Sequence, residues 1–111
     1  MHIFTLSSRY TFYFSTTFLY RIYISDRSNG VKEYIVWQVL DQKLAWFYLE
    51  QGEYLELATD SNGILRSLVF PGLWLGVTEL LAGNMQSVLT ILQSGLQSPE
   101  HTAFVQKLAS E

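Results

Sequence analysis

Short apolar runs alternate with turn-forming breaks through the middle of the chain. Residues 34–40 (YIVWQVL) are apolar on both faces apart from one glutamine, which predicts a central strand that is buried on both sides. Residues 43–49 (KLAWFYL) predict a second strand after a turn at Asp41 and Gln42. In residues 53–58 (EYLELA) two leucines share one face, which predicts a half-exposed third strand nearer the sheet edge. Together these runs predict an antiparallel meander.

A second extended region follows the meander. The DSNG sequence at 60–63 predicts a turn, and residues 64–75 continue in extended form. Pro71 and Gly72 fit the central positions of a type II turn, because proline fixes the first φ and glycine accepts the positive second one.

Beyond this turn the apolar period changes from two to about 3.6, which predicts helices. Thr78 is expected to cap a short helix at 79–82, Asn84 a longer one, and Ser98 a last one that begins with Pro99. The predicted helix faces consist of Met85, Val88, Leu89, Leu92 and Leu96 in the longer helix and of His101, Phe104, Val105 and Leu108 in the last. The order of elements predicts an α+β fold, an antiparallel β-meander followed by C-terminal helices.

Residues 1–28 differ in composition from the rest. They contain four Phe, four Tyr and nine Ser or Thr, but no Glu and no Lys. Residues 10–14 (YTFYF) and 18–24 (FLYRIYI) have high strand propensity and predict strands. The alternative is that a shifted reading frame or a misplaced start has replaced the original N-terminus. We therefore divide the chain into an atypical segment, 1–28, and a regular region, 29–111.

Charge is distributed unevenly along the 111 residues. The net charge is −3, yet residues 1–28 carry three arginines against one aspartate, whereas residues 29–111 carry four basic against nine acidic residues. An acidic region binds phosphate backbones poorly, so any nucleic-acid chemistry needs a localised site or a bound metal. The absence of cysteine excludes disulfides and thiolate metal sites, and two histidines make a histidine zinc site improbable. With no convincing membrane span or signal peptide, we expect a cytoplasmic location.

Few side chains suggest catalysis. His101 lies on an apolar helix face, where a packing role is favoured over a catalytic one. Glu33 opens the first strand of the meander and is expected to be satisfied by Lys32 or a backbone amide. The carboxylates that could form a magnesium cluster are Glu50, Glu53, Glu56 and Asp60. Glu53 and Glu56 are three apart on a predicted strand and so point to opposite faces, which favours solvated rim carboxylates.

An aromatic ladder and a helix pair are the two features with a nucleic-acid alternative. The ladder consists of Trp37, Trp46, Phe47, Tyr48 and Tyr54. Its sequence neighbours are Gln, Asp and Glu instead of Arg and Lys, so cross-strand packing is favoured over base stacking. The last two helices carry one basic residue, Lys107, which disfavours a helix-turn-helix.

The order of these signals resembles the C-terminal half of the Uma2 family of restriction endonucleases. The matching segments are GVKEY at 30–34 before an apolar strand, the aromatic second strand, GILRS at 63–67 and FPGLW at 70–74, followed by the helical end. The likeness covers residues 29–108. It implies a PD-(D/E)xK nuclease fold and Mg²⁺-dependent cleavage of DNA, in which carboxylates hold the ion and a lysine helps to activate water.

The family's catalytic residues lie upstream of the matching region: an Asp, an acidic residue on the following strand, and a Lys before the GVxEYW element. Upstream of Asn29 this chain has one acidic residue, Asp26, and no lysine. At the family spacing, the Lys and Tyr would fall near Ile22 and Asp26, which do not match. We therefore assign no catalytic, cofactor-binding or metal-binding residue and expect no Mg²⁺ site in this chain.

The sequence thus predicts a truncated or frame-disrupted Uma2-like endonuclease fragment, partial in its PD-(D/E)xK core and inactive on DNA. The alternative is a small, non-enzymatic interaction module that oligomerises through an exposed sheet edge or pairs with an intact relative.

Overall fold

The computed structural model describes the backbone of residues 2–5, 10–16, 19–26 and 30–110, and the side chains of residues 21–25 and 30–110. The chain divides into two compact units, a sheet unit at Met1–Leu57 and a helical unit at Ala58–Glu111. The boundary predicted between residues 28 and 29 lies outside the described residues.

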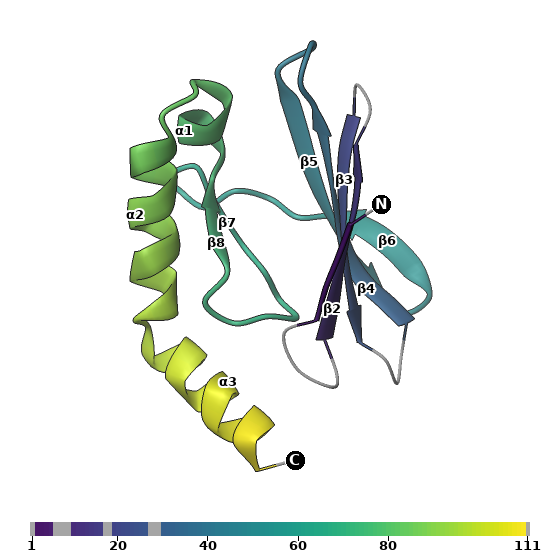
Figure 1. Ribbon diagram of the computed structural model, residues 1–111, viewed down its shortest axis with the longest axis vertical. Coiled ribbons are helices and arrows are strands. Elements are labelled where there is room, and N and C mark those ends of the chain that lie inside the picture. The colour runs from purple at the N-terminus through teal and green to yellow at the C-terminus, as the bar shows by residue number, and fades with distance from the viewer. Residues whose placement is uncertain (1, 6–9, 17–18, 27–29, 111) are drawn as a thin grey trace. The chain divides into compact units, whose positions relative to one another are not determined.

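The sheet unit is one antiparallel sheet of six strands in which each strand pairs with the next along the chain (Figure 1). The strands are β1 (His2–Thr5), β2 (Tyr10–Thr16), β3 (Leu19–Asp26), β4 (Gly30–Gln38), β5 (Lys43–Glu50) and β6 (Glu53–Glu56). The predicted meander corresponds to β4, β5 and β6, and β6 forms one sheet edge, as predicted. The two strands predicted from the N-terminal composition are also present, as β2 and β3.

The prediction for the first strand of the meander was wrong in two respects. β4 ends at Gln38, because Val39 and Leu40 belong to a four-residue turn in which the amide of Gln42 donates to the Val39 carbonyl at 3.3 Å. Burial is also confined to one face, where Glu33 and Ile35 are buried while the residues between and after them are half-buried. β4 therefore has apolar side chains on both faces but fully buried side chains on one face only.

The helical unit begins with a hairpin of β7 (Ile64–Arg66) and β8 (Trp74–Gly76). The amide of Leu73 donates to the Phe70 carbonyl at 3.1 Å, and Gly72 has a φ of 97°, so the predicted turn at Pro71 and Gly72 is confirmed. Only three residues on each side pair as strands, so the extended region is shorter than the sequence predicted.

Three helices follow the hairpin: α1 (Val77–Leu81), α2 (Met85–Leu96) and α3 (Pro99–Ala109). Asn84 and Ser98 cap α2 and α3 as predicted, accepting from the amides of Ser87 and His101 at 3.2 Å each. The cap predicted at Thr78 was wrong, because α1 begins two residues earlier than predicted and Gly76 occupies the N-cap position without a side-chain bond. None of the helices in the described part of the chain is long and apolar enough to cross a membrane.

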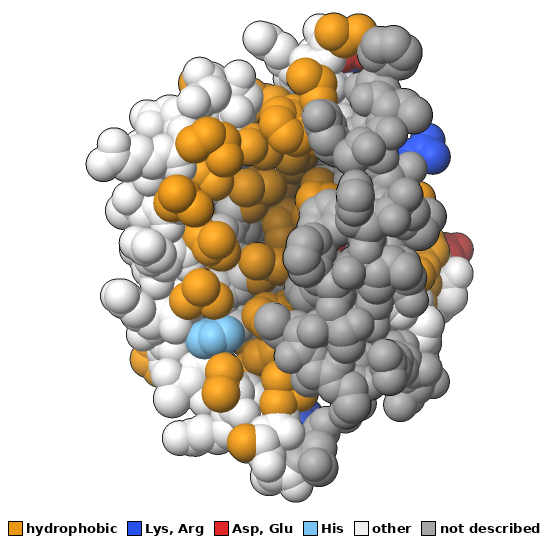
Figure 2. All heavy atoms as spheres, viewed as in Figure 1, with side chains coloured by type: hydrophobic (Ala, Val, Ile, Leu, Met, Phe, Trp, Pro, Cys, Tyr) orange, Lys and Arg blue, Asp and Glu red, His pale blue; other side chains and the backbone are white. Residues whose placement is uncertain are grey.

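Few positions of the predicted helix faces are buried. In α2 the buried residues are Val88 and Gly95, and in α3 Phe104 is the buried residue. Met85, Leu89 and Val105 are each about half exposed. Figure 2 shows hydrophobic side chains at the surface of the described part of the molecule.

Candidate functional site

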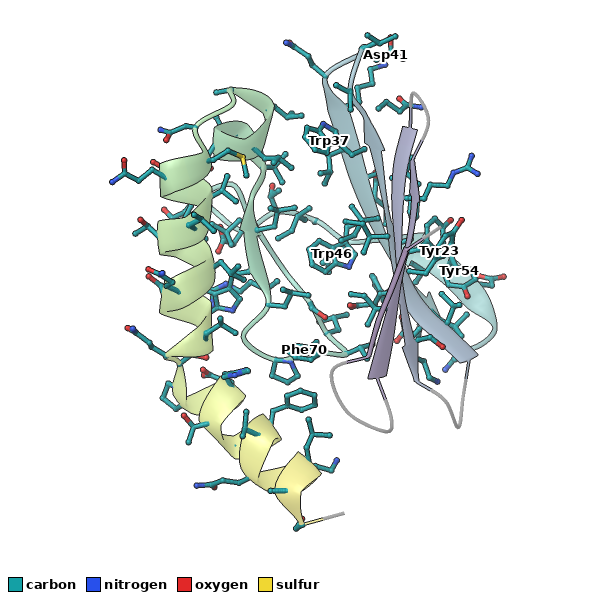
Figure 3. The ribbon with its side chains drawn as sticks, in the orientation of Figure 1. Tyr23, Trp37, Asp41, Trp46, Tyr54 and Phe70 are labelled. Carbon is teal, nitrogen blue, oxygen red and sulfur yellow. The ribbon has the colours of Figure 1, made fainter. Side chains whose placement is uncertain are left out.

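Strand register sorts the aromatic ladder into two faces of the sheet. Because side chains alternate along a strand and cross-strand partners share a face, the pairing of β3 to β6 assigns each residue. The face that we name the Trp46 face contains Ile22, Ile24, Glu33, Ile35, Trp37, Leu44, Trp46, Tyr48, Glu50, Glu53 and Leu55. The face that we name the Tyr34 face contains Arg21, Tyr23, Tyr34, Val36, Gln38, Lys43, Ala45, Phe47, Leu49, Tyr54 and Glu56. Figure 3 shows Trp37 and Trp46 on one side of the sheet and Tyr23 and Tyr54 on the other.

The Tyr34 face holds a cluster of four rings from four adjacent strands. The ring centroid of Tyr34 lies 4.8 Å from that of Phe47 in a stacked arrangement and 5.0 Å from that of Tyr54 in an edge-on one. Tyr23 lies 6.2 Å from Tyr34 on the other side. These separations are favourable for aromatic pairs. The predicted cross-strand packing is therefore confirmed for Phe47 and Tyr54, with Tyr34 as the shared centre.

Trp46 has a different environment on the opposite face. It is 1% exposed, lies opposite Ile35 in the register, and its indole N–H has no hydrogen-bond partner in the described part of the chain. A ring so enclosed cannot offer its face to a ligand. Of the predicted ladder, Tyr54 is the most accessible on the Tyr34 face, with 43% of its surface exposed.

Glu33 lies inside β4 on the Trp46 face, fully shielded from solvent. Its cross-strand neighbours in the register are Ile24 and Tyr48. The sequence predicted a carboxylate at the end of the strand, but β4 begins three residues earlier, at Gly30, and so encloses this position. The expected bond to Lys32 or a backbone amide stays a prediction.

The acidic residues considered as a magnesium cluster, all in the described part of the chain, do not form a group that could hold a metal ion. Glu50 and Glu53 are directly opposite each other across β5 and β6, while Glu56 is opposite Phe47 on the Tyr34 face. The predicted separation of Glu53 and Glu56 onto two faces is confirmed. Within the described ranges, no three His, Cys, Asp or Glu side chains gather closely enough to hold a metal ion.

Asp60 instead organises the start of the hairpin in the helical unit. Its carboxylate accepts from the amides of Asn62 at 2.8 Å and Ile64 at 3.1 Å, and lies 3.3 Å from the Arg66 guanidinium. The Ile64 amide first, then the Asn62 amide and the Arg66 charge, lower the pKa of the Asp60 carboxyl from its ordinary value of 3.8. The guanidinium also lies 4.1 Å from the centroid of the Trp74 ring. The sequence identified the turn but not this arrangement, because Arg66 and Trp74 meet only through the register of the hairpin.

His101 has the packing role that the sequence favoured. Its Nδ1 lies 2.9 Å from the Pro71 carbonyl oxygen, and its ring packs 6.1 Å from that of Phe70 and 6.4 Å from that of Phe104. Because a carbonyl only accepts, Nδ1 carries the proton. The half-buried imidazole thus joins α3 to the turn between β7 and β8.

Sequence reasoning missed three residues of the Tyr34 face: Tyr34 at the centre of the ring cluster, Arg21 and Tyr23. Arg21 and Tyr23 come from the segment judged atypical, yet the pairing of β3 with β4 places both on the Tyr34 face. The signal was the alternating YRIYI sequence at 20–24, which could not be assigned to a face without the register.

Comparisons of the chain with known protein families, with curated proteins and with solved structures found no match. The resemblance to the Uma2 family therefore remains a proposal.

Proposed function

We propose that this chain is a Uma2-like nuclease scaffold, with part of a PD-(D/E)xK core, that lacks the residues for cleaving DNA. The order of elements supports the likeness. GVKEY at 30–34 begins β4, GILRS at 63–67 contains β7, and FPGLW at 70–74 forms the turn into β8.

The proposal that the chain does not cleave DNA rests on the composition of residues 1–28. Where the family has its acidic residues and its lysine, this segment holds Asp26 as its one acidic residue and no lysine. A Mg²⁺ ion in such enzymes binds through carboxylates, activates the attacking water and neutralises charge at the phosphate. The described residues do not fit that role, because the carboxylates of the sheet unit are divided between its two faces and Glu33 is enclosed.

A cleavage assay tests this proposal. Purified chain incubated with supercoiled plasmid and Mg²⁺ is expected to produce no more nicked circle than a matched reaction containing a chelator. A preparation of an unrelated protein made by the same procedure controls for contaminating nuclease. Magnesium-stimulated nicking that follows this chain through successive purification steps would overturn the inactive assignment.

The family assignment has a separate test that needs no protein. Translating the DNA upstream of the Asn29 codon in all three frames is expected to reveal an Asp, an acidic strand and a Lys in another frame. Their absence from every frame would contradict a frame-disrupted Uma2 origin.

A second candidate function is a non-enzymatic interaction module, and the edge strand β6 favours it. All four of its residues are exposed, and the strand has a neighbour on one side only in the sheet order. An open edge can add a strand from another chain. Self-pairing would gather four carboxylates along the joined edge, from Glu53 and Glu56 of each copy. Glu53→Lys reduces this like charge and is therefore expected to strengthen a dimer, whereas Glu100→Lys in α3 is a matched control. A monomer at every concentration in light scattering, for the natural chain and for Glu53→Lys, would exclude self-association through this edge.

A further inference from the structure

The Tyr34 face combines one exposed tyrosine, Tyr54, and half-buried rings with positive charge, although the chain as a whole is acidic. Tyr34 lies at the centre of the ring cluster, and Tyr23 and Tyr54 lie on either side of it on β3 and β6. Figure 3 shows both outer tyrosines projecting from the same side of the sheet. Because the rings come from adjacent strands, their spacing is set by the backbone of the sheet.

The outermost ring is held in place at both ends. The Tyr54 hydroxyl donates to the Val31 carbonyl at 2.8 Å, and the ring rests edge-on against Tyr34. The side chain is nevertheless 43% exposed. A ring that is fixed before binding loses little conformational freedom when a flat ligand stacks on it.

The charges on the two faces of the sheet differ in sign. On the Tyr34 face the charged side chains that the strand register pairs are Arg21, Lys43 and Glu56, all of them exposed. Arg21 is two residues from Tyr23 along β3, and Lys43 opens the strand that carries Phe47. The Trp46 face carries Glu33, Glu50 and Glu53. Arg21 and Lys43 therefore share a face with the exposed ring of Tyr54, whereas three of the four described glutamates in the paired strands lie on the other face.

We propose that the Tyr34 face binds single-stranded nucleic acid. Tyr54 and Tyr23 stack on unpaired bases, and Arg21 and Lys43 contact the adjoining phosphates. Stacking on aromatic side chains is tolerant of sequence, and cations beside the rings follow the backbone. A duplex keeps its base faces stacked inside the helix, so it can use the two cations but not the rings. A purely apolar partner would leave both cations without a role.

Glu56 gives this proposal a sharp internal test. It lies on the Tyr34 face opposite Phe47, and its charge repels a phosphate backbone. Glu53 is three residues away on the same strand but on the Trp46 face. Neutralising each carboxylate separately therefore distinguishes a face-specific site from a general effect of net charge.

The experiment measures fluorescence anisotropy of labelled oligo(dT), oligo(rU) and a duplex of equal length against the full chain, at low and raised salt. Both single strands are expected to bind more tightly than the duplex. Tyr54→Ala is expected to lower affinity at least about fivefold, the loss of one stacked base, whereas Tyr54→Phe retains most of it. Arg21→Ala is expected to weaken binding and to reduce the slope of log affinity against log salt by about 0.7.

Glu56→Gln is expected to tighten binding, and Glu53→Gln to leave it less changed. Circular dichroism checks that each variant is folded, and the pair Tyr54→Phe and Tyr54→Ala separates the ring from the hydroxyl bond. Equal affinity for duplex and single strand, or full affinity in both Tyr54→Ala and Arg21→Ala, would overturn the proposal, as would no measurable binding. Binding to either single strand supports it, and the tighter of the two shows which of the two oligonucleotides the face prefers. The outcome is independent of the plasmid assay, because it needs no cleavage.

Discussion

The sheet unit and the helical unit are held together in different ways. In the sheet unit each strand pairs with its neighbour in the sequence, and the Tyr34 cluster joins rings from consecutive strands. In the helical unit, the turn at Pro71 and Gly72 meets the end of α2 and the start of α3, more than twenty residues further along the chain. Because each strand pairs with its neighbour in the sequence, we expect the sheet unit to tolerate small changes in one strand. In the helical unit, backbone segments that are far apart in the sequence approach each other closely, so we expect a single added atom to lower its stability.

The contact between Gly72 and Gly95 shows this sensitivity. A Cβ on Gly95 would collide with the Gly72 carbonyl oxygen and lie 2.7 Å from the nearest atom of the Trp74 ring. Neither neighbour is the far end of a flexible side chain, so the helix or the turn would have to move. The glycine is therefore required by packing, although its position in the last turn of α2 resembles an ordinary helix-ending signal in the sequence.

The largest expected effect is that of Gly95→Ala. In an exposed helix this change would stabilise by roughly 0.5–1 kcal/mol through backbone entropy. Overpacking against the Gly72 carbonyl and Trp74 outweighs that gain, so we expect a net loss of about 1–3 kcal/mol in the free energy of unfolding. Urea denaturation followed by circular dichroism measures it.

Ser94→Ala is the matched control, one residue earlier in α2 on the exposed side. It removes a hydroxyl bond to the Thr90 carbonyl and is expected to change stability by less than about 0.5 kcal/mol. If Gly95→Ala were as stable as Ser94→Ala, the close approach of Gly95 to Gly72 would not make the helical unit sensitive to a single added atom.

A smaller effect is expected in the sheet unit from Tyr54→Phe. The change removes the hydrogen bond to the Val31 carbonyl and leaves the ring against Tyr34. Because the bond is exposed to solvent, we expect a loss at the lower end of about 0.5–1.5 kcal/mol. Tyr23→Phe, which keeps the ring contact at 6.2 Å, is the control in the same thermal and urea experiments. Equal loss in both variants would show that the Val31 bond is not what stabilises this corner of the sheet.

Much of the fold could be predicted because its signals are local. The α+β class, the meander, the turn at Pro71 and Gly72, and the caps at Asn84 and Ser98 each follow from a few consecutive residues. The length of the turn after β4 was missed because Val39 and Leu40 are strand formers that the turn nevertheless exposes.

The candidate site was less predictable because it depends on register. The sequence grouped Trp46, Phe47 and Tyr54 in one aromatic ladder. In the structure Trp46 is enclosed on the Trp46 face, whereas Phe47 and Tyr54 pack on the Tyr34 face. Arg21 was counted only as part of a basic segment, and its place beside the rings follows from the pairing of β3 with β4. A shift of one residue would reverse every assignment.

The smallest expected effect is on stability at acid pH. It tests whether the charge of a side chain contributes to the stability of the helical unit. The pKa of Asp60 is lowered in the folded chain, so its contribution to stability is fully present above the ordinary value of 3.8 and is lost as pH falls through the lowered folded value. We expect Asp60→Asn to lose part of the decrease in stability that the natural chain shows below about pH 4. Asp41→Asn, in the exposed turn after β4, removes an equal charge from the sheet unit and is expected to retain that decrease. Urea midpoints measured across acid pH for the three chains provide the comparison. If the two variants had the same acid profile, the amide bonds from Ile64 and Asn62 would hold the turn without favouring the charged carboxylate.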